Sequence, residues 1–439
     1  MMTRGRKRRA GGSATLDIIS ELPENIIECI LGRLPIRDAV RMSALSRKWR
    51  YKWSTLPQLL FDYRFFLDTA ADKPLFPTFK FEKSMSIVSK ILLLHSGPIL
   101  KCFLKIPSFR NVAADIDQWQ LYLSRNDIKE LTLDNISYGD QKLLFCNIFS
   151  CQGLTHLKLR FCGFKPPPSF KGFQNLISLE LYLITFSNTT LETIISNSPL
   201  LERLKLVSCS GIDHLIIHAL NLKNIAVRHN VFKSICFEHT PNLTEVSVST
   251  FGIVEIFWCG KITNLVQLLG GLPKIQKLSL EERCLEFLAA GGVPDRLPTP
   301  ANQLKILSLR FIDFNDFDLI SLPLCLIRSS PNLQEIEIWF LAYQSFPVQP
   351  ALNFWELQDC SEYTLEQLRI VKIKFVFGSR PELELIKILL ARSPLLERVF
   401  IERNFYIGED EESHMRRELM RYRRASPTAE IIYLEPEEE

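Results

Sequence analysis

A short apolar motif recurs along this chain and limits the folds that it can adopt. The motif is Leu-x-x-Leu-x-Leu, with Ile or Val as frequent substitutes, and its eleven copies are spaced 21 to 35 residues apart. A period of this length is typical of a solenoid, in which each repeat packs against its neighbours. The final alternation of each copy places its apolar side chains on one face of a strand. The copies begin at residues 128, 154, 176, 201, 222, 243, 275, 304, 333, 368 and 396.

Helical segments are expected between several of these strands. They include residues 190–196, 319–328 and 382–392, and Ser-Pro or Thr-Pro pairs that follow such segments end the helix before the next strand. A helix at 79–94 and a strand at 101–106 precede the first copy. The predicted fold class is therefore α/β: a leucine-rich-repeat solenoid with parallel strands on its concave side and helices outside.

Polar or thiol groups follow four of the expected strands at the same distance. Cys162, Cys209, Asn230 and Asn404 each lie three residues after the last apolar position of a copy. In leucine-rich repeats this position points inwards, and its polar group satisfies backbone atoms of the turn. We therefore interpret the two cysteines as structural groups, in preference to a metal or redox role.

A different pattern near the N-terminus predicts three short helices. Apolar residues spaced by three and four follow Leu22-Pro23, and Leu34-Pro35 ends this first helix because a residue before proline disfavours the helical region. Further helices are expected at about 36–44 and 46–53. A helix trio of some forty residues buries too little surface to be stable alone, so we expect a partner to cover its remaining apolar face.

The order of residues in this segment resembles the F-box. Leu-Pro, Ile-x-x-x-Ile-Leu, a second Leu-Pro and Leu-Ser-x-x-Trp follow one another between residues 22 and 49. The resemblance implies that the helix trio docks on the Skp adaptor of a cullin-based, SCF-type ubiquitin ligase. A helical cap that packs only on its own chain is the alternative. The residues that would form or support the adaptor contact are Leu22, Pro23, Ile26, Ile30, Leu31, Leu34, Pro35, Leu45 and Trp49.

The C-terminal part resembles a second element of the same family. Residues 367–404, followed by the run RRASPTAEIIYLE, are similar to the FBD region of plant F-box proteins. A strand at 430–433 is expected to close the open end of the solenoid. The chain as a whole resembles plant F-box/FBD/LRR-repeat proteins. The predicted division is a disordered basic tail (1–16), the F-box (17–60), a connector (61–114), the leucine-rich-repeat solenoid (115–366) and the FBD region (367–439).

Charge and composition argue against several other classes of protein. Residues 1–60 hold 12 Lys/Arg against 5 Asp/Glu, which leaves 41 against 44 in the remainder, so no basic surface for nucleic acid is expected. No apolar run reaches the length of a membrane span. Eleven scattered cysteines indicate reduced thiols, and we expect a nuclear or cytoplasmic protein, or both. The basic run at 5–9 fits a nuclear-localisation patch or a solvated tail.

No pattern in the chain indicates a catalytic or metal centre. The paired Cys-x-x-Cys ligands of a zinc-bearing RING, a Gly-rich phosphate loop and Gly-x-Ser-x-Gly are all absent. His214 and His218 are four residues apart, but the glutamate of a zinc-protease pattern is missing, so we interpret them as ordinary histidines. We predict no catalytic residue, no metal site and no cofactor.

The polar positions of the motif predict a charged concave surface. The early copies are basic and are interrupted by Glu180 and Tyr182, whereas the later copies turn acidic. The hypothesis is a basic patch for an acidic target segment or an anionic small molecule, and the alternative is a solvated charged face. The residues of the predicted patch are Lys158, Arg160, Arg203, Lys205 and Arg228.

These observations predict a substrate-recognition subunit of an SCF-type E3 ubiquitin ligase. The F-box would bind the Skp adaptor and, through it, a cullin, while the solenoid would bind a protein target of unknown identity. Such a receptor is not an enzyme, because it acts by raising the local concentration of a target lysine. A non-degradative binding scaffold and an enzyme with an unrecognised site between repeats are the alternatives.

Overall fold

The computed structural model describes most of the chain. The described residues are 18–68, 77–106, 113–135, 143–144, 147–186, 190–211, 213–230, 234–250, 255–258, 261–262, 264–289, 292–313, 317–341 and 363–436. The predicted basic tail (1–16) and most of the stretch between the ninth and tenth copies lie outside these residues.

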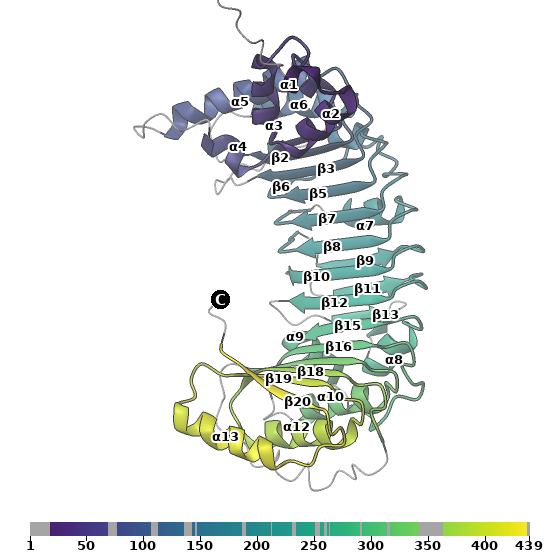
Figure 1. Cartoon of the computed structure of the whole chain (residues 1–439). Helices are drawn as coiled ribbons and strands as arrows, with labels where there is room; N and C mark the ends of the chain where they lie inside the picture. The colour runs from purple at the N-terminus through teal and green to yellow at the C-terminus, as the bar shows by residue number, and fades with distance from the viewer. Residues whose placement is uncertain are drawn as a thin grey trace, which may run out of the picture.

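Within the described residues, one long sheet of fourteen strands runs along the stack (Figure 1). Its strands are β1 (Gln58–Phe61), β2 (Lys101–Ile106), β3 (Glu130–Asn135), β5 (His156–Arg160), β7 (Ser178–Tyr182), β8 (Arg203–Val207), β10 (Asn224–Asn230), β12 (Glu245–Thr250), β15 (Lys277–Glu281), β16 (Ile306–Ile312), β17 (Glu335–Phe340), β18 (Ile370–Val376), β19 (Arg398–Arg403) and β20 (Glu430–Leu434). They lie in this order, and every neighbouring pair is parallel. Each of the eleven motif copies forms one strand of this sheet, so the predicted solenoid of parallel strands is confirmed.

The register of the strands explains why the motif produces this sheet. Leu157 pairs with Leu179, which pairs with Leu204, which in turn pairs with Ile225. All four side chains are at most 2% exposed, so the apolar positions of successive repeats form one continuous buried row. Each such side chain contributes about 1.5–3 kcal/mol by leaving water. A shift of one residue would turn the whole row outwards, and this fixes the register.

The sheet begins before the first motif copy. β1 and β2 pair with each other, and β2 pairs with β3, so the main sheet starts at Gln58, well before the predicted solenoid boundary at 115. The predicted strand at 101–106 is thereby confirmed as β2, but it was not counted as a motif copy because Cys102 stands where the motif has its second leucine, although Ile99 fills the leading position. The segment predicted as a connector also forms helices that pack beside these strands. They are α4 (Tyr63–Asp68), α5 (Pro77–Leu94) and α6 (Ala113–Ser124).

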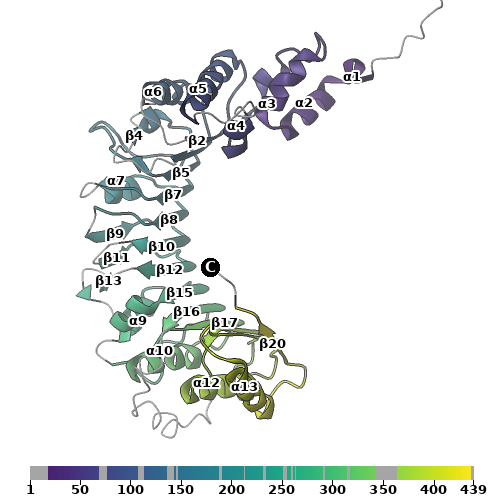
Figure 2. The ribbon, with the colours of Figure 1, turned by 90° about the vertical axis from the view of Figure 1, so that its left-hand side faces the viewer.

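Helices cover the convex side of the sheet at both ends of the stack (Figure 2). They are α7 (Thr190–Ser196), α8 (Leu265–Gly270), α9 (Glu282–Ala289), α10 (Phe317–Arg328) and α12 (Arg380–Arg392). The predicted helices at 190–196, 319–328 and 382–392 are thereby confirmed. Ser198 and Ser330, which precede the prolines, donate their hydroxyls to helix carbonyls at 2.7 Å and help to end α7 and α10.

The middle repeats depart from the prediction of helices outside. Their convex layer is a second sheet built from β9 (His214–His218), β11 (Ser234–Glu238), β13 (Glu255–Trp258) and β14 (Lys261–Ile262). The motif copies at 201, 222 and 243 are only 21 residues apart. So short a repeat leaves room for a second strand between two turns, whereas a helix of several turns would not fit.

The inward polar positions behave as predicted where they are described. The Cys162 thiol lies 3.0 Å from the Arg160 carbonyl, and the Cys209 thiol lies 3.5 Å from the Leu181 carbonyl. The side-chain oxygen of Asn404 accepts the backbone N–H of Tyr406 at 3.0 Å. These groups satisfy turn backbone inside the stack. The side chain of Asn230 is outside the described part of the structure.

A short extra sheet lies beside the early repeats. It pairs β4 (Leu143–Leu144) with β6 (Cys162–Gly163), and the 3-10 turn η3 (Asn147–Ser150) lies between these two strands in the chain.

The N-terminal segment forms two of the three expected helices. α1 (Ile18–Glu21) leads into α2 (Glu24–Arg33), and α3 (Ile36–Arg41) continues as the 3-10 turn η1 (Met42–Ala44). The helix expected at 46–53 is wrong: the chain makes turns there and then the 3-10 helix η2 (Lys52–Thr55). Tyr51 has a left-handed backbone with φ 62°, which no continuous α-helix can include.

The C-terminal region continues the stack. The predicted closing strand is present as β20, which pairs in parallel with β19. α12 and α13 (Glu409–Arg421) lie at the opposite end of the molecule from α1–α3 (Figure 1). Glu382 near the start of α12 accepts the backbone N–H groups of Phe377 and Ser379 at 3.1 and 2.9 Å. Its burial nevertheless raises the pKa of this carboxyl to about 7.

Glu382 provides a test through the pH dependence of stability. Its pKa is higher in the folded chain than the ordinary value of 4.5, so its stabilising effect is complete below pH 4.5 and is lost as the pH rises through 7. Glu382→Gln keeps an acceptor but cannot ionise. We expect the variant to exceed the parent in stability by roughly 1–3 kcal/mol at pH 8 and to lose most of this advantage at pH 5. Urea unfolding at both pH values measures this, and parallel pH profiles would contradict it.

Candidate functional site

The predicted adaptor-binding residues divide into two groups by exposure. Leu31 and Trp49 are 0% and 1% exposed, and the Trp49 Nε1–H donates to the Ile19 carbonyl at 3.1 Å. These two residues hold the helices together and present nothing to a partner. Leu22, Ile30 and Leu34 are partly buried against the same core. The exposed members of the predicted set are Pro23, Ile26, Pro35 and Leu45.

Exposed apolar groups on this segment extend beyond the predicted set. Ile26 and Leu45 are 41% and 50% exposed, and Ile19 and Tyr51 add two large side chains at 50% and 59%. The sequence pattern missed Ile19 because it precedes the first Leu-Pro pair, and it missed Tyr51 because a continuous helix was assumed there. This segment of about thirty-five residues therefore carries four large apolar side chains that its own chain leaves uncovered.

One part of the predicted contact faces the rest of the chain. Leu34 and Pro35 line a cavity of about 900 Å³ together with Leu60 of β1 and Phe65 of α4. The second Leu-Pro pair therefore lies at the junction between the N-terminal helices α1–α3 and the first strands. Figure 2 shows α1–α3 extending away from the stack beyond this junction.

The basic residues predicted on the concave face lie on adjacent strands but are partly neutralised. Lys158 lies 3.5 Å from Glu180, and Arg160 lies 3.8 Å from Asp134. Arg203 contacts the His156 ring nitrogen at 3.0 Å. The positive charge available to a ligand is consequently smaller than the sequence suggested.

Tyr182, which seemed to interrupt the basic row, lies at its centre. The ammonium groups of Lys158 and Lys205 lie 5.0 and 5.4 Å from the centre of the Tyr182 ring. The Tyr182 hydroxyl donates to Glu180 at 2.8 Å. Burial, together with this carboxylate, raises the pKa of the hydroxyl, so it stays protonated as a donor. We call Lys158, Glu180, Tyr182 and Lys205 the tyrosine cluster.

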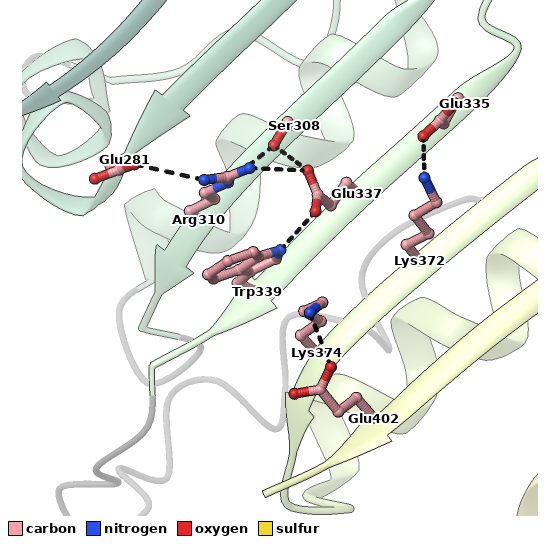
Figure 3. A network of polar contacts seen from close by, with 9 residues as sticks. All are labelled: Glu281, Ser308, Arg310, Glu335, Glu337, Trp339, Lys372, Lys374 and Glu402. Atoms are coloured by element: carbon pink, nitrogen blue, oxygen red, sulfur yellow. Dashed lines mark hydrogen bonds and ion pairs between the residues drawn. The ribbon is translucent and has the colours of Figure 1, made fainter. Parts of the chain in front are cut away.

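The expectation that the later copies form an acidic surface is wrong. Figure 3 shows basic side chains from neighbouring strands between the carboxylates. Arg310 occupies an outward position of β16, and Lys372 and Lys374 occupy outward positions of β18. The pairs are Arg310 with Glu281 (4.0 Å) and Glu337 (3.4 Å), Lys372 with Glu335 (2.7 Å), and Lys374 with Glu402 (3.0 Å).

Trp339 organises this second group of charges. Its ring lies between Arg310 and Lys374, at 4.3 and 5.1 Å from the two cationic groups, and its Nε1–H donates to Glu337 at 2.9 Å. Burial alone would raise the pKa of Glu337, but hydrogen bonds from Ser308, Trp339 and Arg310 outweigh burial and lower it. We call Glu281, Ser308, Arg310, Glu337, Trp339 and Lys374 the tryptophan cluster.

A shallow trough connects the two clusters. Its cavity measures about 500 Å³, and small side chains form its floor. Tyr182 and Trp339 lie six strand spacings apart, which corresponds to about 29 Å along the sheet. Tyr182 and Trp339 lie outside the lining, each two residues beyond a lining glutamate (Glu180 or Glu337) at one end of the cavity. The floor residues are Ala226, Ser247, Ser279 and Ser308.

Three of the buried thiols are chemically inert. Burial raises the pKa of the thiols of Cys102 and Cys151 to about 12 and that of Cys325 to about 11, so these thiols stay protonated and unreactive. Among the described helices, none combines the length and the apolar character needed to cross a membrane.

The helices α2 and α3, which each follow a Leu-Pro pair, together with the leucine-rich-repeat stack define the class of F-box proteins that carry such repeats. Residues 19–60 match the model of the F-box domain, and residues 116–338 match that of the LRR repeats of FBD-associated F-box protein At5g56370. F-box/FBD/LRR-repeat protein At1g13570 of Arabidopsis thaliana is 40% identical over 95% of this chain and 99% of its own length. F-box/FBD/LRR-repeat protein At5g56420 of the same plant is 25% identical over 95% and 99%. The chain belongs to the F-box/FBD/LRR-repeat family.

The tryptophan cluster yields a stability test. Arg310→Met leaves Glu337, whose side chain is 19% exposed, without its cation. We expect a loss of about 1–3 kcal/mol in the free energy of unfolding at neutral pH, measured with urea. The loss should become smaller in acid. Because the pKa of Glu337 is lowered in the folded chain, its carboxylate stabilises the fold above the ordinary pKa of 4.5, and this contribution disappears as the pH falls.

Lys372→Met is the matched control for that variant. It also removes a cation from an outward position, but its pair with Glu335 is more exposed, at 40% and 26%. Exposed pairs contribute about 0–1 kcal/mol, so this variant should remain close to the parent. Equal losses in the two variants would refute a special role for the tryptophan cluster.

Proposed function

We propose that this protein is the substrate-recognition subunit of an SCF-type E3 ubiquitin ligase. The F-box binds a Skp-type adaptor and, through it, a cullin, and the concave face of the sheet binds a protein target. The observation that carries the proposal is that Ile19, Ile26, Leu45 and Tyr51 leave large apolar side chains uncovered on the F-box segment of a chain of this family. The protein contributes proximity and makes no bond itself, and its proposed location is the nucleus, the cytoplasm or both.

The adaptor contact is proposed to centre on Ile26 and Leu45. They are the predicted residues that combine a large apolar side chain with high exposure, whereas Leu31 and Trp49 act by holding the helices in place. Buried apolar anchors carry most of the free energy of protein interfaces, commonly more than about 2 kcal/mol each. A charge at either position would be desolvated without a partner in the complex.

The first functional test replaces these anchors with charges. We expect the variant Ile26→Asp with Leu45→Asp to lose capture of the Skp adaptor by at least about tenfold, measured by titration with purified adaptor. Its melting temperature should stay close to that of the parent, because both side chains already contact water.

A matched control carries the same change on the solenoid. Leu200 and Leu220 are 48% and 59% exposed, and Leu200→Asp with Leu220→Asp should bind the adaptor as the parent does. Undiminished adaptor binding by the Ile26 and Leu45 variant would exclude this contact. Recovery of the adaptor without a cullin would favour the alternative, a non-degradative scaffold.

The target is proposed to bind across the trough between the tyrosine and tryptophan clusters. Tyr, Trp and Arg are the residues most enriched among interface anchors, and both clusters present such groups beside cations. The clusters are also held in place before binding by their own ion pairs, which limits the ordering cost of association. The chemistry favours a target segment with acidic groups at its tyrosine-cluster end, near Arg203 and Lys205.

Charge reversal on the early strands tests this proposal. We expect Lys158→Glu, Arg203→Glu and Lys205→Glu together to remove most target proteins captured by the parent when degradation is blocked, measured by quantitative affinity capture. Adaptor binding should not change. The control reverses three exposed loop lysines, Lys165, Lys171 and Lys274, and should capture the parental set. An unchanged set in the first variant would rule out the basic patch.

A further inference from the structure

Three potential metal ligands meet on the convex side of the stack, far from the concave face. β9 and β11 of the second sheet are parallel neighbours, and their last residues, His218 and Glu238, are register partners. His239 follows directly, with a left-handed backbone of φ 48°. Residues from two consecutive repeats are thereby brought together at the ends of two strands.

The geometry of this group is compact and open to solvent. One donor atom from each of His218, Glu238 and His239 lies within 4.8 Å of the others. The two imidazole rings are 4.6 Å apart between centres and are tilted by 35°. Both histidines are exposed, and the glutamate is partly buried, so an ion can enter from water without any opening of the fold.

The donor set decides which ion fits. Two imidazoles and one carboxylate match the ligands that zinc takes at sites with an open fourth position. Donor atoms on a tetrahedral zinc ion lie about 3.4 Å apart. Side-chain rotations that move the donor atoms by about 1 Å would bring the three atoms to this spacing. Calcium and magnesium prefer sites made of oxygen atoms, and a single carboxylate supplies too few.

A neighbouring thiol helps to fix the carboxylate. The Cys236 sulfur lies 3.6 Å from a carboxylate oxygen of Glu238, two residues along β11 and on the same face. Groups that orient a ligand in this way raise the affinity of metal sites. Cys236 is 7% exposed, so its thiol contacts the carboxylate from a buried position in the second sheet.

We propose that His218, Glu238 and His239 form a binding site for a divalent transition-metal ion, with zinc as the ion that the ligands fit best. The ion links the end of β9 to the turn after β11 and so ties together two successive repeats. Its fourth position holds water or accepts a donor from another molecule.

The pairing of these histidines could not be read from the sequence. His214 and His218, the pair that is near in sequence, lie at opposite ends of β9. The pair that meets is separated by 21 residues, the length of one short repeat. Only the parallel register of the outer strands turns that spacing into proximity.

The test uses zinc chloride and the full chain after treatment with a chelator. The Cys29→Ser background removes the one thiol that is exposed among the described cysteines. Isothermal titration should show one zinc ion bound, with affinity reduced at least about tenfold by His218→Ala or His239→Ala and also reduced by Glu238→Gln. Zinc should raise the melting temperature of the parent and not that of the histidine variants.

Two controls make the result decisive. His214→Ala changes a histidine on the same strand, outside the site, and should bind zinc as the parent does. Magnesium chloride should give no saturable binding. The proposal is overturned if the parent binds no zinc, if the two histidine variants bind it unchanged, or if His214→Ala weakens binding as much as they do.

Discussion

The structure depends on one constraint, the register that keeps the leucine rows of successive strands in line. Leu157, Leu179, Leu204 and their equivalents lose nearly all contact with water because the parallel strands keep one register over the motif positions; the shifts in three strand pairs come after these positions. Parallel pairing brings the same positions of every repeat together along the sheet, buried residues on one side and polar residues on the other. The concave face and its charged rows are therefore consequences of the core.

That constraint also explains why the charges of the concave face form pairs. Outward positions on neighbouring strands lie about 4.8 Å apart, so opposite charges at these positions come within reach of each other. Lys372 meets Glu335, and Arg310 meets Glu337, because the register places them on adjacent strands. The surface that results carries paired charges beside the aromatic side chains of Tyr182 and Trp339. Such a surface favours recognition by shape and by few strong contacts over attraction by bulk charge.

Much of the fold followed from the sequence because local pattern and global packing agree. Every motif copy became a strand, and the helix at 190–196 matched α7 to the residue. The errors occurred where the local pattern was ambiguous. Spacing alone did not reveal the left-handed Tyr51 that breaks the third expected helix, nor the outer strands β9 and β11, which carry no leading leucine. The sequence identified residues of the adaptor contact but could not tell their roles apart. Burial shows that Leu31 and Trp49 support the helices, whereas Ile26 and Leu45 face water.

The sequence by itself determined the architecture: an F-box segment, a stack of leucine-rich repeats and a closing strand, because periodic apolar residues admit only one way of being buried together. The tertiary structure alone decided which charges neutralise each other, which apolar side chains remain uncovered, and that His218 meets His239 beside Glu238. The physical reason is that these outcomes depend on distances between residues of different repeats. Strand register sets those distances, and no local pattern encodes them.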